Sequence, residues 1–200
     1  LFKNTWVIFT ADHGEMLGDH HMSQKNLFFE GSAHVPLLIM PPQGRSLPQN
    51  ISVEAPADLV DLYPTILAMA GLSSPVSVSG KNLLEPVPMD RIFFGNSLNR
   101  NFCVMEEKVK LVYSAVGDHV LLFDLNTDPM EQHNLAEDPA WQERKAKLWK
   151  LLLEHTAQYT PEALDENGQF LTYEAPHFPG DVPGRWFGFH YHDYSVDTFH

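Results

Sequence analysis

A short polar loop near the start of the chain combines residue types that bind metal ions and anions. Asp12 and His13 come directly after the apolar run 5–10. A carboxylate and an imidazole side by side are two potential ligands for a divalent cation. Lys25 adds a cation to the same loop, which ends at a second apolar run, 37–40. A loop this rich in ionisable residues is more than a connection between two strands requires.

The apolar run before Asp12 is the element that must position the pair. Residues 5–10 lack polar alternation and include β-branched residues, a pattern typical of a strand buried on both faces of a parallel sheet. In open α/β sheets, ligands bind beyond the carboxyl ends of the strands, which is where this strand would deliver Asp12 and His13. Gly14 is then expected to let the chain turn sharply. A competing interpretation treats Asp12 as a turn former or helix cap and His13 as a surface residue.

Type I sulfatases, which belong to the alkaline phosphatase superfamily, carry a metal-binding segment that this loop resembles. The resemblance lies in Phe9-Thr10-Ala11-Asp12-His13-Gly14-Glu15-Met16-Leu17-Gly18-Asp19-His20, Lys25 and Val35-Pro36-Leu37. It implies that Asp12 and His13 bind a divalent cation, usually calcium in this family, and that Lys25 contacts the sulfate. Lys25 follows Asp12 by 13 positions, a spacing shared by the iduronate-sulfatase-like branch and by the related phosphonate monoester hydrolases.

These residue types suit the hydrolysis of a sulfate ester. A divalent cation stabilises negative charge on the transferring group, and the Asp12 carboxylate is a hard ligand for Ca²⁺ or Mg²⁺. The imidazole of His13 is softer, which leaves Mn²⁺ or Zn²⁺ open. A lysine ammonium suits a tetrahedral oxyanion, so Lys25 is interpreted as a catalytic and substrate-binding residue. Glu15 and His34 are further candidates to face the substrate.

The resemblance also implies a nucleophile, the formylglycine that sulfatases make from an upstream Cys/Ser-x-Pro-x-Arg motif. The sequence contains no such motif, because Cys103 lies in Asn-Phe-Cys-Val-Met. The chain is therefore interpreted as the C-terminal portion of a longer enzyme, with the missing N-terminal half as its partner, and as inactive by itself. A phosphonate monoester or phosphodiester hydrolase of the same superfamily is one alternative. A non-catalytic binding module is another.

Composition excludes several other classes of protein. The formal net charge is −13, which argues against a protein that binds nucleic-acid phosphates. No apolar run approaches the roughly 20 residues that a membrane-spanning helix needs. The resemblance implies a small-molecule or carbohydrate sulfate ester as the partner. The resemblance favours a periplasmic or secreted location, with a cytoplasmic one left open, and the oligomeric state is not predicted.

The whole chain is predicted to have an α/β fold in three regions. Residues 1–88 would form the C-terminal part of a mainly parallel, alkaline-phosphatase-like sheet domain. Residues 89–159 would form a small antiparallel sheet packed on a helix. Residues 160–200 read as an irregular surface tail rich in aromatic residues and His. His190 and His192 have the spacing of a metal-ligand pair, but no third ligand clusters with them.

Local signals place the expected elements along the chain. Short strands are predicted at 91–95, 102–106, 109–114 and 120–123, and helices at 58–71 and 138–158. Gly71 is expected just past the end of the first helix and Asp138 at the N-cap of the second. The segment 123–136 resembles a motif in the C-terminal subdomain of sulfatases. Its Asp-Pro and Asn-Leu pairs are interpreted as turn and capping residues, and His133 as a surface residue.

Overall fold

A computed structural model of the protein describes all residues except 1, 23, 26, 46–50 and 175–200. The chain divides into two units, the first made of residues 1–12 and 35–91 and the second of residues 13–34 and 92–200. The polar loop thus belongs to the same unit as the C-terminal sheet, although the strands on either side of it belong to the first unit. The three sequence regions, 1–88, 89–159 and 160–200, remain predictions.

The described residues of the first unit form one pair of strands. β1 (Val7–Thr10) and β2 (Leu37–Met40) are antiparallel to each other, with Val7 opposite Met40. Phe9 is 62% exposed and Leu38 is 58% exposed. The predicted burial of the first strand on both faces is therefore wrong for the described residues. The reason is that the sheet formed by these residues has two strands, which leaves the outward side chains uncovered.

Caps fix both ends of the helix in the first unit. This helical segment consists of η2 (Leu59–Asp61) and α2 (Leu62–Met69). At its start, the side chains of Asp58 and Asp61 form a capping box. At its end, Gly71 has a φ of 72°, and the Leu72 amide donates to the Leu67 carbonyl at 2.8 Å. This is the Schellman arrangement, and it confirms the predicted position of Gly71.

Asp61 is the buried polar centre of the first unit. Its side chain is 0% exposed and accepts two hydrogen bonds from the Arg91 guanidinium, at 2.5 and 2.9 Å. The backbone amides of Lys81 and Asp58 donate two more, at 2.7 and 2.8 Å. Burial alone would raise the pKa of Asp61, but these hydrogen bonds and the Arg91 charge outweigh it and hold the pKa below its ordinary value.

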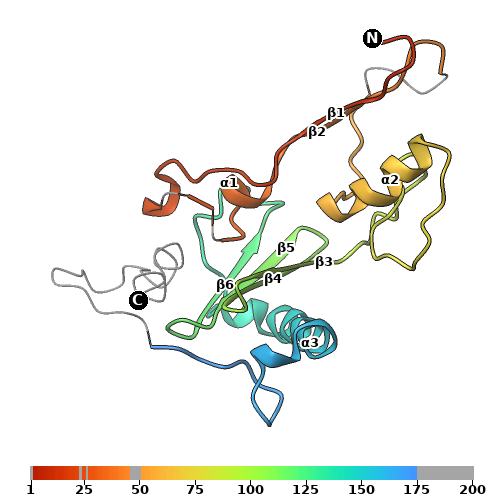
Figure 1. The fold of residues 1–200 in the computed structure, drawn as a ribbon. Helices are drawn as coiled ribbons and strands as arrows, with labels where there is room; N and C mark the ends of the chain where they lie inside the picture. The colour runs from red at the N-terminus through yellow and green to blue at the C-terminus, as the bar shows by residue number, and fades with distance from the viewer. Residues whose placement is uncertain (1, 23, 26, 46–50, 175–200) are drawn as a thin grey trace, which may run out of the picture. The chain divides into compact units, whose positions relative to one another are not determined.

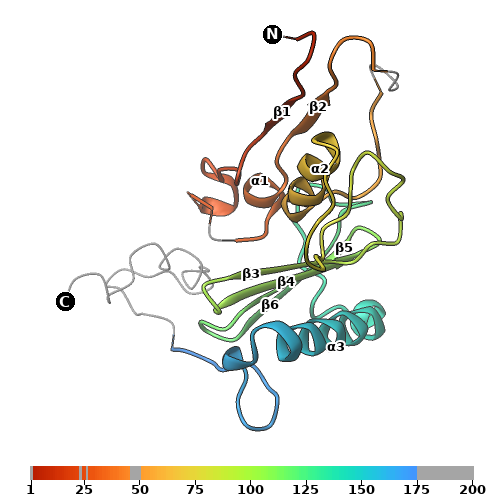
Figure 2. The same ribbon diagram turned by 45° about the vertical axis from the view of Figure 1, so that its right-hand side comes forward.

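The second unit is built on an antiparallel sheet (Figure 1). Its strands are β3 (Phe93–Ser97), β4 (Asn101–Glu106), β5 (Val109–Ser114) and β6 (His119–Asp124), in that spatial order. The turn η3 (Pro139–Trp141) leads into α3 (Gln142–Tyr159), which lies along one face of this sheet (Figure 2). The Asp138 carboxylate accepts a hydrogen bond from the Ala140 amide at 2.8 Å. The predicted meander, its covering helix and the N-cap are confirmed.

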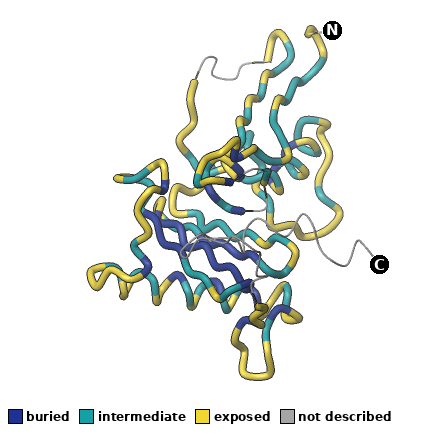
Figure 3. The backbone as a smooth tube through the Cα atoms, turned by 90° about the vertical axis from the view of Figure 1, so that its left-hand side faces the viewer, coloured by how far each residue is buried: buried dark blue, intermediate teal, exposed yellow. Residues whose placement is uncertain are grey.

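Most residues of β4 and β5 are buried (Figure 3), and the buried hydrophobic residues of β4, β5 and β6 alternate between two clusters. The helix-side core includes Phe102, Val104, Leu111, Leu122, Leu148 and Leu152. The loop-side core contains Met16, Met22, Leu27, Phe29, Cys103, Val112, Leu121 and Phe123. Half of the loop-side residues come from the segment 13–34. The segment that carries the candidate residues is thus a second layer over the sheet, opposite α3.

The first part of the tail contributes to the helix-side core. After η4 (Pro161–Ala163), the chain buries Phe170, whose ring centroid lies 4.6 Å from that of Phe102 and 4.7 Å from that of Tyr113. The prediction of a surface segment is wrong here, because the aromatic rings of the sheet offer Phe170 an apolar contact. His190 and His192 lie outside the described residues. Within the described residues, no helix combines the length and apolar character needed to cross a membrane.

Candidate active site

The predicted site residues lie on or beside the segment 13–34, which we call the candidate loop. It contains the short helical turns η1 (Asp19–His21) and α1 (Glu30–Ala33). Backbone hydrogen bonds join the start of the loop to α1. The Gly14 amide donates to the Ser32 carbonyl at 2.7 Å, and the Glu15 amide donates to the Gly31 carbonyl at 2.9 Å. The backbone that follows His13 is therefore held directly against α1.

Gly14 serves this close approach and not a sharp turn. Gly14 is not among the glycines with positive φ. A Cβ atom at this position would lie 2.1 Å from the Gly31 carbonyl oxygen and 3.3 Å from that of Ser32. The predicted turning role of Gly14 is wrong, because what this position requires is the absence of a side chain where two backbones meet.

His13 and Lys25 contact each other directly. Nδ1 of His13 lies 2.7 Å from the carbonyl oxygen of Gly14. A carbonyl oxygen can only accept, so Nδ1 carries the ring proton and Nε2 presents its lone pair. Nζ of Lys25 lies 2.8 Å from that Nε2 and donates to it. The structure thus brings together the predicted metal ligand His13 and the predicted sulfate-binding residue Lys25.

The His13 ring has the tautomer of a metal ligand, but Nε2, the atom that would bind the metal, accepts a hydrogen bond from Lys25. Metal-bound histidines commonly donate their second ring nitrogen to a carbonyl or carboxylate, as Nδ1 of His13 does. Because Nε2 has one lone pair, it cannot accept from Lys25 and bind an ion at once. Among the described residues, no group of three or more His, Cys, Asp or Glu side chains could hold a metal. The roles of Asp12 and His13 as metal ligands therefore remain predictions, and an ion bound there would need further ligands.

Glu15 and His34 have partners within the candidate loop. The Glu15 carboxylate accepts from the Gln24 amide and, at 3.4 Å, from the Leu17 amide. Nδ1 of His34 lies 2.7 Å from Oε2 of Glu30, and the His34 side chain is 76% exposed. Glu15 thus links the two ends of the segment 15–24, while Glu30 orients the exposed imidazole of His34. The substrate-facing roles of Glu15 and His34 remain predictions.

Sequence reasoning missed a buried ion cluster beneath the candidate loop. Lys110 on β5 is 3% exposed and donates to Glu131 at 2.8 Å and to Glu30 at 2.5 Å. Its third donor goes to the Phe28 carbonyl at 2.8 Å. Burial alone would raise the pKa of Glu30, but the charges and hydrogen bonds of Lys110 and His34 outweigh it and lower that pKa. The cluster therefore joins the sheet to the start of α1.

The sequence did contain signals for this cluster. Lys110 interrupts an otherwise apolar strand, and Glu131 lies within the segment 123–136 that resembles a sulfatase motif. The structural role predicted for Asn134 is confirmed, since its Oδ1 accepts from the Ala136 amide at 3.0 Å, in a local turn, and from the Leu122 amide at 2.9 Å. His133 is a surface residue as predicted, with its side chain 82% exposed. The motif thus combines backbone capping with a buried carboxylate.

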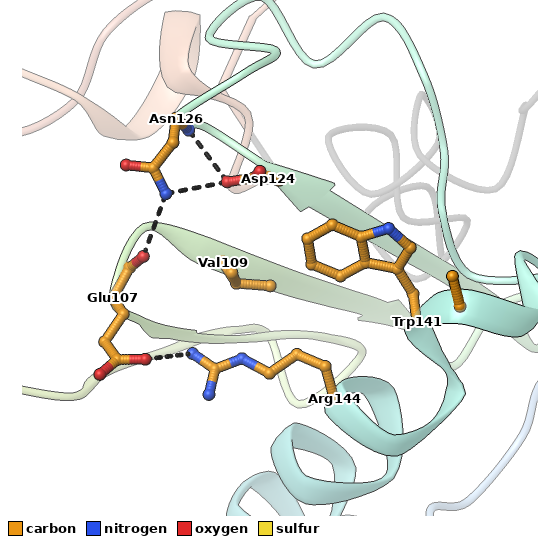
Figure 4. Close-up of a pocket in the computed structure, with 7 residues that line it drawn as sticks. Glu107, Val109, Asp124, Asn126, Trp141 and Arg144 are labelled. Atoms are coloured by element: carbon orange, nitrogen blue, oxygen red, sulfur yellow. Dashed lines mark hydrogen bonds and ion pairs between the residues drawn. The ribbon is translucent and has the colours of Figure 1, made fainter.

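An open pocket of about 590 Å³ lies elsewhere in the second unit. It is lined by Glu107, Val109, Asp124, Asn126, Ala140, Trp141 and Arg144 (Figure 4). Its polar groups already bind one another: Arg144 donates to Glu107 at 3.3 Å, and Asn126 donates to Asp124 at 2.9 Å. None of the candidate residues lines it. The pocket is therefore not the place of the predicted chemistry.

Cys103 is excluded as a nucleophile by its burial in the loop-side core. Burial raises the pKa of its thiol to about 12. Because the thiolate is the reactive form, we expect folded protein at pH 8 to react with an aromatic disulfide reagent at least ~100-fold more slowly than unfolded protein. The measurement is the rate of thiolate release by absorbance, with and without denaturant. Equal rates would show that Cys103 is accessible.

Comparison with known proteins finds a matching family model and similar proteins over most of the chain. Residues 1–72 match the family model described as Sulfatase. Arylsulfatase K of Xenopus laevis is 35% identical over 156 residues, which cover 68% of this chain and 28% of that protein. The chain spans about a third or less of the length of the curated relatives it matches, 32% of one and 28% of another.

Solved structures share the fold. The phosphonate monoester hydrolase of Agrobacterium radiobacter superposes with a TM-score of 0.61 at 31% identity, over 82% of this chain and 38% of that one. A 2-O GAG sulfatase superposes with a TM-score of 0.68 at 23% identity, over 92% of this chain and 43% of that one. This likeness confirms the predicted fold class. The family match and the shared fold together identify the chain as a member of the type I sulfatase family, with an alkaline-phosphatase-like fold.

Proposed function

We propose that this chain is the C-terminal part of a hydrolase that cleaves sulfate esters with a divalent cation. The formylglycine nucleophile would come from the N-terminal part of the full-length protein. The observation that carries the proposal is the contact between His13 and Lys25, because it joins the two kinds of group that the reaction needs on one loop. The name of the relative arylsulfatase K supports sulfate as the group transferred.

Each candidate residue has a proposed role. Asp12 and His13, consecutive in the chain, are proposed to bind the cation, with calcium as the first choice and Mn²⁺ or Mg²⁺ as alternatives. When bound, such an ion stabilises the negative charge that develops on the transferring group and the leaving oxygen. Lys25, once its ammonium leaves Nε2 of His13, has three N–H donors for the oxygens of a tetrahedral anion. Glu15 and His34 are proposed to face the substrate.

A second candidate function is the hydrolysis of phosphonate monoesters. It is favoured by the 31% identity to the Agrobacterium radiobacter enzyme. A phosphonate monoester is also a tetrahedral oxyanion, so the same cation ligands and the same lysine would serve it. The site residues are therefore common to both candidates, and only the substrate separates them.

The test compares two substrates with the full-length protein supplied with Ca²⁺. We expect kcat/KM to be higher for an aryl sulfate than for an aryl phosphonate monoester. Lys25→Met should lower kcat/KM by about 100- to 1,000-fold, the typical effect of removing one group that stabilises transition-state charge. Asp12→Asn should raise the Ca²⁺ concentration needed for half-maximal activity, because the ion loses a charged ligand. A chelator should abolish the activity of the unmodified enzyme until Ca²⁺ is restored.

Two exposed residues provide matched controls. Lys150→Met removes the same charge from the surface of α3, where the side chain is 76% exposed, and should leave kcat/KM unchanged. Glu166→Gln does the same for an exposed carboxylate. A preference for the phosphonate would move the protein to the second candidate function. Absence of activity on both esters, with or without Ca²⁺, would reject both and favour a non-catalytic binding module.

A further inference from the structure

The cluster around Lys110 holds the candidate loop to the sheet with every donor and acceptor used. An ammonium has three N–H donors, and those of Lys110 go to Glu30, Glu131 and the Phe28 carbonyl, at 2.5 to 2.8 Å. The second oxygen of Glu131 accepts from the backbone amide of Glu30 at 2.7 Å. Phe28 and Glu30 belong to the candidate loop, so Lys110 and Glu131 fix it at two positions around the start of α1.

Aromatic packing supports the same attachment. Gly95 on β3 leaves room for the Phe28 ring, since a Cβ there would lie 2.3 Å from a ring carbon. Next to it, the ring centroids of Phe29 and Phe123 are 5.8 Å apart. His20 from the far side of the loop stacks on Phe29 at 4.1 Å. Phe28 and Phe29 thus hold the loop on the sheet by apolar contacts in addition to the ion cluster.

Ser32 connects α1 to the candidate pair. It is 2% exposed, and its hydroxyl donates to the Lys25 carbonyl at 2.6 Å. Its own carbonyl accepts from the amide of Gly14, the residue after His13, at 2.7 Å. One buried residue of α1 therefore holds the backbone beside both members of the pair. Hydrogen bonds together with the backbone of α1 therefore connect Lys110 to Gly14, the residue after His13, and to Lys25.

The buried charges of Lys110, Glu30 and Glu131 are better suited to fixing the position of the candidate loop than to stabilising the fold. A buried ion cluster stabilises a fold no better than apolar residues of similar size, because desolvation of the ions offsets their attraction. What it does supply is a defined relative position, since each hydrogen bond fixes a distance and a direction. We propose that Lys110 is a positioning residue for His13 and Lys25, acting through Glu30, Glu131 and Ser32. This inference rests on the proposed function.

Two variants test the inference in the full-length enzyme. Lys110→Met removes the attachment, and Ser32→Ala removes one hydrogen bond while leaving the ion cluster intact. We expect Lys110→Met to lower kcat/KM for the aryl sulfate on the order of 100-fold and Ser32→Ala to lower it on the order of 10-fold. Small displacements of reacting groups have effects of this size. Leu111→Ala is the matched control: Leu111 follows Lys110 on β5, is 0% exposed and belongs to the helix-side core. It should destabilise the sheet while kcat/KM of the folded enzyme stays within about twofold.

A double-mutant cycle separates positioning from a general loss of structure. If Lys110 acts through His13 and Lys25, Lys110→Met should lower kcat/KM by clearly less once Lys25→Met is already present than it does alone, because only the part that acts through His13 is left. A full and independent loss in that background would overturn the inference. Ser32→Ala placed on Lys25→Met should behave in the same way, and it remains informative if Lys110→Met does not fold.

A third measurement does not depend on activity. Amide hydrogen exchange at Gly14 and Glu15 reports the hydrogen bonds that join the loop to α1. We expect Lys110→Met to raise exchange at these two amides by at least about tenfold while the amides of β5 keep their protection. Unchanged exchange at Gly14 and Glu15 would overturn the positioning role. If the enzyme hydrolyses neither ester, the proposed function fails, and the exchange data still decide whether Lys110 holds the loop.

Discussion

Replacement of Asp61 by alanine is expected to lower the free energy of unfolding by about 3–5 kcal/mol, the usual loss when one partner of a buried ion pair is removed. The Arg91 side chain, 13% exposed, would keep its charge without the two hydrogen bonds it now donates to Asp61. The backbone amides of Asp58 and Lys81 would lose their acceptor as well. Unsatisfied buried donors of this kind are costly, and here three groups depend on one carboxylate.

Urea titration of the full-length protein measures this loss. Asp90→Ala is the control, because Asp90 precedes Arg91 but is exposed and should change the free energy of unfolding by no more than about 0.5 kcal/mol. Since the pKa of Asp61 in the folded protein lies below its ordinary value of 3.8, its stabilising effect is present above that value. The effect is lost as the pH falls through the lowered pKa. The difference in free energy of unfolding between wild type and Asp61→Ala should therefore become smaller in acid. Equal losses for the two variants at neutral pH would contradict the assignment.

Gly14→Ala should damage both stability and activity. A methyl group 2.1 Å from the Gly31 carbonyl oxygen must push apart two backbone segments, and neither can rotate away as a side chain would. Overpacking typically costs about 1–3 kcal/mol, and a clash with backbone belongs at the upper end. Separation of Gly14 from Ser32 would also move His13, so we expect kcat/KM of the full-length enzyme to fall on the order of 100-fold.

Gly31→Ala is the matched control for this variant. Gly31 lies opposite Gly14, yet a Cβ there would meet its nearest neighbour, the Met16 sulfur, at 3.4 Å. This is close to an ordinary contact, and alanine is the better helix former within α1. Denaturant titration and steady-state kinetics on both variants check the prediction. If Gly14→Ala matched Gly31→Ala in stability and kcat/KM, the close approach of the two backbones would be refuted.

The sequence predicted the elements whose signals are local. The meander from β3 to β6 follows from short apolar runs separated by turn residues, and the helix caps at Asp138 and Gly71 follow from residue type at fixed offsets. The candidate residues His13 and Lys25 were also found on one loop, because both belong to a single short motif. Local patterns of this kind need no knowledge of the rest of the fold.

The features that sequence reasoning missed depend on contacts between distant segments. Lys110 and Glu30 are 80 positions apart, and the sequence pattern of neither segment predicts contact with the other. The role of Gly14 was predicted wrongly for the same reason. The backbone that leaves no room for a side chain at this position belongs to α1, which lies further along the chain. Burial of β1 was mispredicted because an apolar run indicates a strand but not which segments cover it.

The separation of the candidate loop from its sheet also sets an order for assembly of the molecule. Neighbouring strands of the β3–β6 sheet are joined by short turns, so their pairing requires little loss of chain entropy. The candidate loop is divided from β3 by the residues 35–91 that belong to the other unit, and the entropy of closing so long a connection must be overcome before Lys110 can reach Glu30. We therefore expect the sheet to form first, with one apolar face still open. Because the groups proposed for catalysis depend on that late docking step, the chain can acquire most of its secondary structure before it has any trace of its site.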